Sequence, residues 1–158
     1  MRQTFSELLF EELNYNKDII VVTADLGYGM WDKIKDTFAS NYYNVGSAEQ
    51  LMTGVCIGLA ENKKIPIAYS ITPFLLCRPY ELIRNYINNE KIPVKLVGSG
   101  RDNDYEHDGF SHYAYDDEKI LSNFENVVIY KPTTINELKE QFLDFLYNKK
   151  PSYLNLKR

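Results

Sequence analysis

An acidic residue, Glu49, lies at the start of a segment whose other residues are mostly small or apolar. The sequence Ser47–Gln50 has the form of a capping box and predicts a helix that begins near Ala48. The residues that follow Glu49 on its side of this helix are uncharged: Thr53, Cys56 and Ala60. Burial raises the pKa of a carboxyl group, whereas a helix N-terminus favours the anion by about 0.3–1 kcal/mol. Glu49 is therefore a candidate for proton chemistry, although a first-turn residue that only complements the helix dipole fits the same pattern.

Further polar residues lie in the segment Ser99–Tyr115, which contains both histidines of the chain. This segment predicts a loop, either a purely solvated one or one that contacts a hydroxylated substrate. His112 equally fits the first residue of a helix. His107 and His112 lack a third ligand, so we predict no metal site in this chain. The Gly-rich segment Asp25–Gly29 lacks the Lys and Ser/Thr of a phosphate-binding P-loop.

Strands and helices alternate along the chain and place these residues in loops. Short apolar runs predict strands at Asp18–Thr23, Tyr42–Val45, Ile65–Ser70, Pro93–Gly98, Asn126–Tyr130 and Ser152–Leu156. Apolar residues at helical spacing predict helices at Arg2–Asn14, from Ala48 onward, and at Arg78–Asn88 and Ile135–Tyr147. The pattern predicts an α/β fold, a doubly wound and mostly parallel sheet with helices on both faces. Function in such sheets lies beyond the carboxyl ends of the strands, here Asp25–Gly29, Gly46–Glu49, Ile71–Phe74 and Ser99–His112.

Length and composition exclude several classes of protein. A chain of 158 residues with 44% hydrophobic residues suits one globular domain spanning residues 1–158. The 22 acidic and 18 basic residues give a net charge of −4, so we expect no nucleic-acid partner. No apolar run reaches the roughly 18–20 residues of a membrane span, and Met1–Phe10 does not have the form of a signal peptide. Cys56 and Cys77 show no paired spacing, so we expect a cytoplasmic protein.

A specific resemblance emerges when the loops and their flanks are taken together. The segment Asn44–Gly54 reads NVGSAEQLMTG and resembles NVGIAEQNMVG, a motif of the pyrimidine-binding domain of transketolase-like enzymes, which use thiamine diphosphate. Five other segments resemble further motifs of this domain, in the same order along the chain. Thr23–Gly27 resembles the (S/T)ADL loop, Phe74–Asn85 resembles F-x3-R-A-(Y/W)-(D/E)-Q-I-R-N, and His107–His112 resembles E-D-G-x-T-H. Lys131–Glu137 resembles R-P-x-D-x-x-E, and Pro151–Leu154 resembles G-P-x-Y-(I/L). Each motif is modest, but their order over almost the whole chain makes the resemblance specific.

The resemblance implies a cofactor and residues that bind it. Glu49 would hydrogen-bond the N1′ nitrogen of the cofactor's aminopyrimidine ring and so promote removal of the proton at C2 of the thiazolium ring. This role requires a dry site and a carboxyl group with a raised pKa. Phe74 would stack on the aminopyrimidine, although it also fits an ordinary core position. Asp25 and Leu26 would belong to the cofactor-binding loop.

The resemblance also implies partners. Family members hold Mg²⁺ and the cofactor's diphosphate with a GDG…N motif on a second domain, and this chain has no Gly-Asp-Gly. We therefore expect half of a split enzyme, a pyrimidine-binding subunit that transfers a two-carbon ketol unit between carbohydrates. Its partner subunit would carry GDG…N, and the family suggests a heterotetramer. The small-residue face of Gly54 and Gly58 and the loop Asp25–Met30 are candidates for the buried contacts.

The substrate remains open at this point. The resemblance implies that Asp108 and His112 contact substrate hydroxyl groups. Members acting on sugar phosphates place a phosphate-binding His where this chain has Gly100, and an Arg where it has Lys131. Lys lacks the bidentate fork of Arg, so we do not expect a simple sugar phosphate unless Arg101 compensates. Two alternatives stay open: a subunit of a split thiamine-diphosphate-dependent 2-oxoacid decarboxylase, and a non-catalytic domain that only binds a partner.

Overall fold

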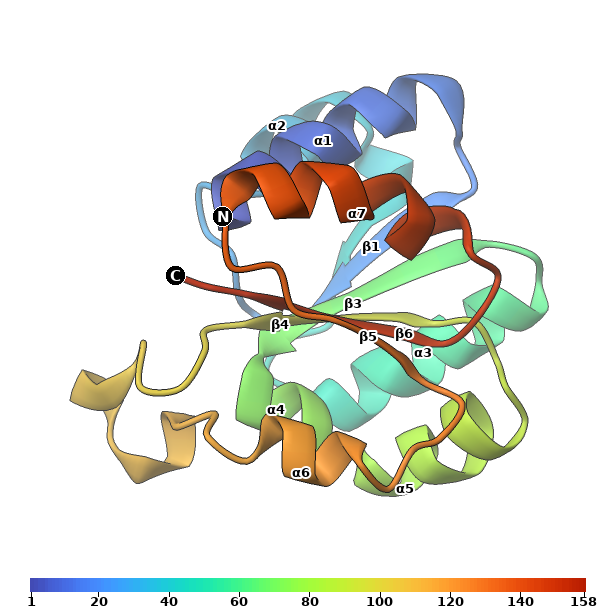
Figure 1. Ribbon diagram of the computed structural model, residues 1–158. Coiled ribbons are helices and arrows are strands. Elements are labelled where there is room, and N and C mark those ends of the chain that lie inside the picture. The colour runs from blue at the N-terminus through green and yellow to red at the C-terminus, as the bar shows by residue number, and fades with distance from the viewer.

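The computed structural model describes residues 1–158, and its central element is a sheet of six parallel strands (Figure 1). The strands are β1 (Ile19–Thr23), β2 (Tyr42–Asn44), β3 (Ile65–Ile71), β4 (Lys95–Ser99), β5 (Val128–Tyr130) and β6 (Ser152–Leu156). Their order across the sheet is β2-β1-β3-β4-β6-β5. Because every pair is parallel, the carboxyl ends of all strands lie at the same edge, where the loops with the candidate residues begin.

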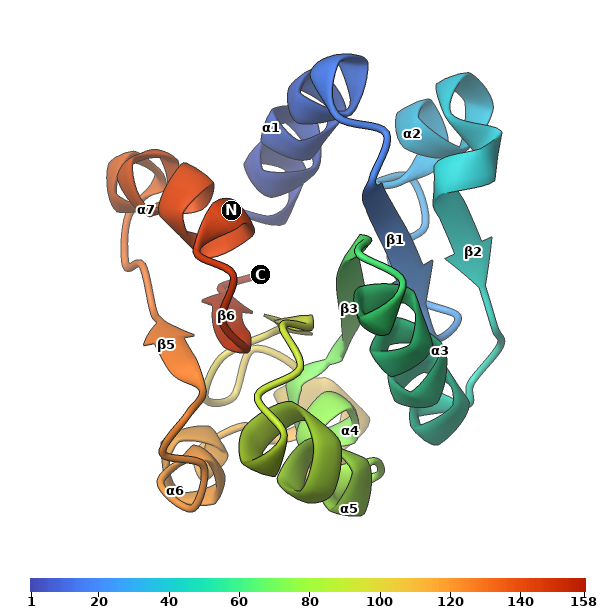
Figure 2. The ribbon, with the colours of Figure 1, turned by 90° about the vertical axis from the view of Figure 1, so that its right-hand side faces the viewer.

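Helices cover both faces of the sheet, as Figures 1 and 2 show. One face carries α1 (Arg2–Tyr15), α2 (Asp32–Thr37) and α7 (Ile135–Tyr147); the other carries α3 (Glu49–Glu61), α4 (Thr72–Cys77), α5 (Tyr80–Leu82) and α6 (Asp117–Leu121). Successive side chains of β1 enter opposite cores: Ile19 and Val21 pack with α1 and α7, and Ile20 and Val22 pack with α3. Burial on both sides explains the continuous apolar runs and confirms the predicted doubly wound α/β fold. None of the helices combines the length and apolar character that a membrane span requires.

The predicted capping box at Ser47–Gln50 is wrong. Helix α3 begins at Glu49 as expected, but its N-cap is Ala48, and no side chain makes a cap hydrogen bond. The backbone N of Ala48 donates to Gly46 O at 2.7 Å, so a tight turn at Gly46, with φ of +75°, directs the chain into the helix. A side-chain cap does exist at α7, where Thr134 accepts a hydrogen bond from Glu137 N at 3.1 Å.

The segment after β3 is more helical than the sequence indicated. Helix α4 replaces most of the loop expected at Ile71–Phe74, because Pro73 stands in the first turn, where its missing N–H is tolerated. The helix expected at Arg78–Asn88 begins at Tyr80 and continues from Ile83 to Asn89 as a π-helical segment. The short helices α2 and α6 and three 3₁₀ turns, at Ala39–Asn41, Glu106–Asp108 and Phe110–His112, were not predicted.

Candidate active site

Asn44, the last residue of β2, joins two of the loops at the carboxyl edge. Its Oδ1 accepts hydrogen bonds from the backbone N of Asp25 and of Gly46, each at 3.0 Å. The Asp25 carboxylate is exposed and accepts from Tyr28 Oη at 2.6 Å and from Asn44 Nδ2 at 3.3 Å. Both hydrogen bonds lower the pKa of Asp25, and the bond from Tyr28 has the larger effect. Leu26 is fixed by its backbone, since its N donates to Thr23 Oγ1 and its O accepts from the same hydroxyl.

Glu49 lies at the start of α3 and is 3% exposed. Its Oε1 accepts a hydrogen bond from Ser70 Oγ at 3.0 Å, and its Oε2 accepts from Arg78 Nη1 at 2.6 Å. Ser70 is buried near the end of β3, whereas the Arg78 side chain is 45% exposed. The structure thus confirms the expected dry setting of Glu49 and adds a partner that sequence analysis did not assign, a guanidinium lying between the carboxylate and solvent.

Phe74 lies beside this ion pair. Helix α4 places Arg78 one turn after Phe74, and the guanidinium carbon of Arg78 lies 3.8 Å from the centroid of the Phe74 ring. The His112 ring packs edge-on against Phe74, with ring centroids 4.8 Å apart and planes at 68°. The side chain of Phe74 is only partly buried, so it is not an ordinary core residue. Arg78 therefore links Glu49 to Phe74, and His112 joins the cluster through its contact with Phe74.

The Arg78 guanidinium shows what this arrangement can hold. It is a planar group that lies on Phe74 and donates a hydrogen bond to Glu49 at the same time. A flat nitrogen-containing ring such as an aminopyrimidine needs the same two contacts, so Glu49 and Phe74 fit such a ring. The chain offers no group of three His, Cys, Asp or Glu residues that could hold a metal ion. The fit therefore extends to the ring of the expected cofactor but not to Mg²⁺.

The other expected residues lie near this cluster without joining it. Asp108 is exposed, and its Oδ2 lies 3.2 Å from Nε2 of its neighbour His107. His112 Nδ1 is 3.1 Å from Ser111 Oγ, which leaves its Nε2 without a protein partner. No hydrogen bond joins Asp25, Leu26 or Asp108 to Glu49. Beside His112, a hollow of about 350 Å³ is lined partly by exposed aromatic residues of the same loop, Phe110 and Tyr115.

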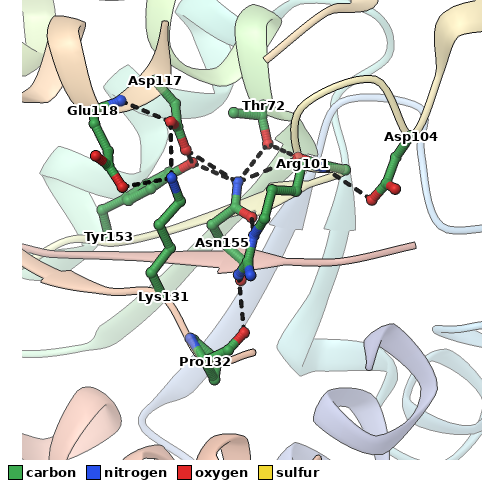
Figure 3. A network of polar contacts seen from close by, with 10 residues as sticks. Thr72, Arg101, Asp104, Asp117, Glu118, Lys131, Pro132, Tyr153 and Asn155 are labelled. Carbon is green, nitrogen blue, oxygen red and sulfur yellow. Dashed lines mark hydrogen bonds and ion pairs between the residues drawn. The ribbon is translucent and has the colours of Figure 1, made fainter. Parts of the chain in front are cut away.

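A buried polar network fills the edge of the sheet next to this loop (Figure 3). The carboxylate of Asp117, 2% exposed, accepts hydrogen bonds from Tyr153 Oη at 3.0 Å and from Asn155 Nδ2 at 3.3 Å. Lys131 Nζ lies 3.3 Å from Asp117 Oδ1 and 2.7 Å from Glu118 Oε1, so two carboxylates neutralise it. Sequence analysis assigns no role to Asp117 or Asn155, because neither stands in a recognisable motif.

Arg101 is held by the same network. Its Nε donates to Asn155 Oδ1 at 2.7 Å, and its Nη2 donates to Pro132 O and to Asn155 O, both at 2.9 Å. Most of its hydrogen-bonding edge is therefore used within the chain. Arg101, the residue that could compensate for the weakened phosphate site, therefore has partners within the chain, as Lys131 does.

Comparison with known proteins agrees with this geometry. The model of the family described as transketolase, pyrimidine binding domain, matches residues 1–158. A protein provisionally named a transketolase C-terminal section, from Methanocaldococcus jannaschii, is 31% identical over 159 residues, covering 100% of this chain and 50% of its own. The 6-deoxy-6-sulfo-D-fructose transketolase subunit SqwH of Clostridium sp. is 29% identical and is covered to 49%. The chain thus spans about half the length of these relatives.

Solved structures give the same result. A split gene transketolase described as an inactive beta4 tetramer superposes with a TM-score of 0.87 at 27% identity, covering 99% of this chain and 50% of its own. A transketolase from Pichia stipitis has a TM-score of 0.86 at 18% identity, which supports the fold alone. The fold defines a doubly wound α/β domain of the type found in transketolases. The chain belongs to the transketolase pyrimidine-binding domain family, which confirms the resemblance drawn from the sequence.

Proposed function

We propose that residues 1–158 act as the pyrimidine-binding domain of a two-subunit, thiamine-diphosphate-dependent transketolase-like enzyme that transfers a two-carbon ketol unit between carbohydrates. The main support is the arrangement of Glu49 and Phe74 around one planar group, because an aminopyrimidine ring needs both contacts at once. The relatives named as transketolase subunits agree with this proposal. The two free cysteines, Cys56 and Cys77, agree with a reducing compartment such as the cytoplasm.

In this proposal each residue of the cluster has a defined task. The carboxyl group of Glu49 shares a proton with the ring nitrogen of the bound pyrimidine, and Ser70 fixes its orientation through Oε1. Phe74 supports one face of the ring. Asp25 and Leu26 complete the cofactor-binding loop. Thiamine diphosphate, when bound, supplies the carbon nucleophile that the protein itself lacks.

Substrate contacts are proposed for Asp108 and His112. In this proposal the Nε2 of His112, which has no protein partner, hydrogen-bonds a substrate hydroxyl group; its support is the position of the His112 ring beside Phe74. The carboxylate of Asp108 is exposed and can accept a hydrogen bond from another hydroxyl group. Since Lys131 and Arg101 are both engaged within the chain, we propose a carbohydrate whose far end is not held as a simple phosphate by these two residues.

We further propose that a second subunit carries GDG…N and binds Mg²⁺ and the diphosphate group. The absence of any metal-binding cluster in this chain supports a metal site elsewhere. A split gene transketolase described as an inactive beta4 tetramer supports self-association. We propose that the complete enzyme is a heterotetramer that also contains the partner subunit. Helix α3 offers a suitable surface, because Gly54 and Gly58 leave open space on its outer side.

The test is the Glu49→Gln variant in the enzyme reconstituted with its diphosphate-binding subunit. We expect ketol transfer to fall by about 10²–10⁴-fold, because an amide cannot share its proton as a carboxyl group does. Glu61→Gln, at the exposed end of the same helix, is the matched control and should keep full activity. Circular dichroism and complex mass should be unchanged in both variants. Full activity of Glu49→Gln would refute the mechanism, and release of carbon dioxide from a 2-oxoacid would identify the decarboxylase alternative.

A further inference from the structure

Arg78 occupies a position that the proposed function requires for another group. Its guanidinium carbon lies 3.8 Å from the centroid of the Phe74 ring, and its Nη1 lies 2.6 Å from Glu49 Oε2. The guanidinium is flat and has hydrogen-bond donors along its edge. An aminopyrimidine is also flat, and its N1′ nitrogen can hydrogen-bond Glu49 when the carboxyl group carries the shared proton. The side chain of Arg78 therefore makes, within the chain, the same pair of contacts that we propose for the cofactor ring.

The two groups compete for one place. Glu49 contacts a group that lies on one face of Phe74, so the carboxylate lies on that side of the ring. A pyrimidine on the opposite face of Phe74 would be separated from Glu49 by Phe74 itself. The edge of Phe74 is also partly covered by His112. A ring that stacks on Phe74 and reaches Glu49 Oε2 must therefore take the volume that the guanidinium now fills.

The ion pair also explains how the free chain tolerates Glu49. The carboxylate is almost fully buried, and Ser70 is its one other side-chain partner. A buried carboxylate without a compensating charge is strongly destabilising. Arg78 supplies this charge, yet its side chain is 45% exposed and sits at the end of α4. It can leave for solvent without opening the core.

We propose that Arg78 is a displaceable occupant of the pyrimidine site: it pairs with Glu49 and covers Phe74 in the free chain, and the aminopyrimidine ring replaces it on binding. This inference rests on the proposed function, since it takes Glu49 and Phe74 as the ring's contacts. Arg78 is thus a positioning residue that acts through Glu49, and it lowers the affinity for the ring by competing with it.

The test uses the full chain and hydroxymethylpyrimidine, the aminopyrimidine half of thiamine, so that no partner subunit is needed. Probe binding is followed by NMR through the ring protons of Phe74 and the Nε–H signal of Arg78. Arg78→Met removes the competing charge and should bind the probe about tenfold more tightly, which corresponds to about 1.4 kcal/mol. Arg84→Met is the control and should bind like the wild type, because Arg84 is exposed and its side chain hydrogen-bonds Asn85, away from Glu49 and Phe74.

In the wild-type chain, the Arg78 signal should shift to that of a solvent-exposed arginine as the probe saturates the Phe74 signals. This measurement holds even if the variant folds poorly. A probe that shifts Phe74 while leaving the Arg78 signal unchanged, with equal affinity for wild type and Arg78→Met, would overturn the displacement and leave the proposed function intact. A probe that binds neither chain would overturn both.

Discussion

Lys95, at the start of β4, gives the fold a pH dependence whose sign follows from its burial. The side chain is 1% exposed, and its Nζ donates to Asn148 Oδ1 at 2.6 Å and to Lys150 O at 2.8 Å. Burial lowers the pKa of Lys95 to about 8 from an ordinary 10.5, with Asp144 opposing the shift. The folded chain therefore holds this proton less tightly than the unfolded chain does.

The consequence is a stability that rises with pH in a defined window. Below about pH 8 both states bind the proton, so the burial of the charged amine destabilises the fold by a constant amount. Between pH 8 and 10 the unfolded chain keeps the proton while the folded chain releases it, and the free energy of unfolding increases. At about 1.36 kcal/mol per pKa unit, the gain over this window is about 2–3 kcal/mol. Above pH 10 tyrosines act in the opposite direction, because burial raises the pKa of Tyr130 and Tyr153.

The assay is urea unfolding followed by circular dichroism at pH 8, 9 and 10, on wild type and on Lys95→Met. The variant loses the hydrogen bonds to Asn148 and Lys150, which changes its free energy of unfolding by the same amount at each pH. The pH dependence of the difference in unfolding free energy between the two proteins therefore reports the titration of Lys95. Wild type should gain about 2–3 kcal/mol relative to Lys95→Met from pH 8 to 10. Lys139→Met, at an exposed position in α7, should show the same change in unfolding free energy with pH as wild type. Parallel curves for wild type and Lys95→Met would refute the argument.

Two further predictions concern the buried carboxylate of Asp117 and the surface of α3. Asp117→Ala should lower the free energy of unfolding by about 1–3 kcal/mol in urea titrations, because the buried hydroxyl of Tyr153 loses its acceptor and Asn155 loses one of several. A loss below about 0.5 kcal/mol would contradict this account of the network. Gly54→Leu should stabilise the isolated chain by about 0.5–1 kcal/mol, since the only atom near the added carbon is Leu82 Cδ1 at 3.9 Å, yet it should weaken assembly. Thermal unfolding and analytical ultracentrifugation measure the two effects, and an unchanged complex mass would exclude this face as an interface.

The sequence predicted best those elements whose buried residues follow a regular pattern over the whole element. The bounds of β6, which is buried at every residue, and of α7, whose apolar residues form one periodic face, agree with the prediction to the residue. Helix α2 buries only Ile34, and α6 buries only Asp117 and Leu121, so neither has a periodic apolar face to detect. The sequence did not predict α4, because a proline such as Pro73 is common both in loops and in the first turn of a helix.

The candidate site was predictable only in part, for a related reason. Motif order identified Glu49, Phe74 and His112, and the structure places them in one cluster, in which Arg78 contacts Glu49 and Phe74, and His112 packs on Phe74. The contact between Glu49 and Arg78 spans 29 positions of the sequence and depends on the packing of α4 against β3, which no local pattern encodes. Asp108 matched its motif equally well but lies outside the cluster, since it turns toward its neighbour His107. Its role in substrate binding stays a prediction.

The two buried carboxylates of the chain differ in a way that bears on which of them does chemistry. Asp117 accepts from Tyr153, Asn155, Lys131 and the backbone N of Glu118, and most of these donors are themselves held in the core. Exchanging any of them would leave buried groups without partners, so Asp117 keeps this set of hydrogen-bond partners. Glu49 has Ser70 on one oxygen and a half-exposed guanidinium on the other. Removing Arg78 with no replacement would leave a buried carboxylate uncompensated, but the half-exposed guanidinium can move into solvent when a bound ring takes its place beside Glu49. Glu49 is therefore the buried acid that can change its partner, which a group that shares a proton with a cofactor must be able to do.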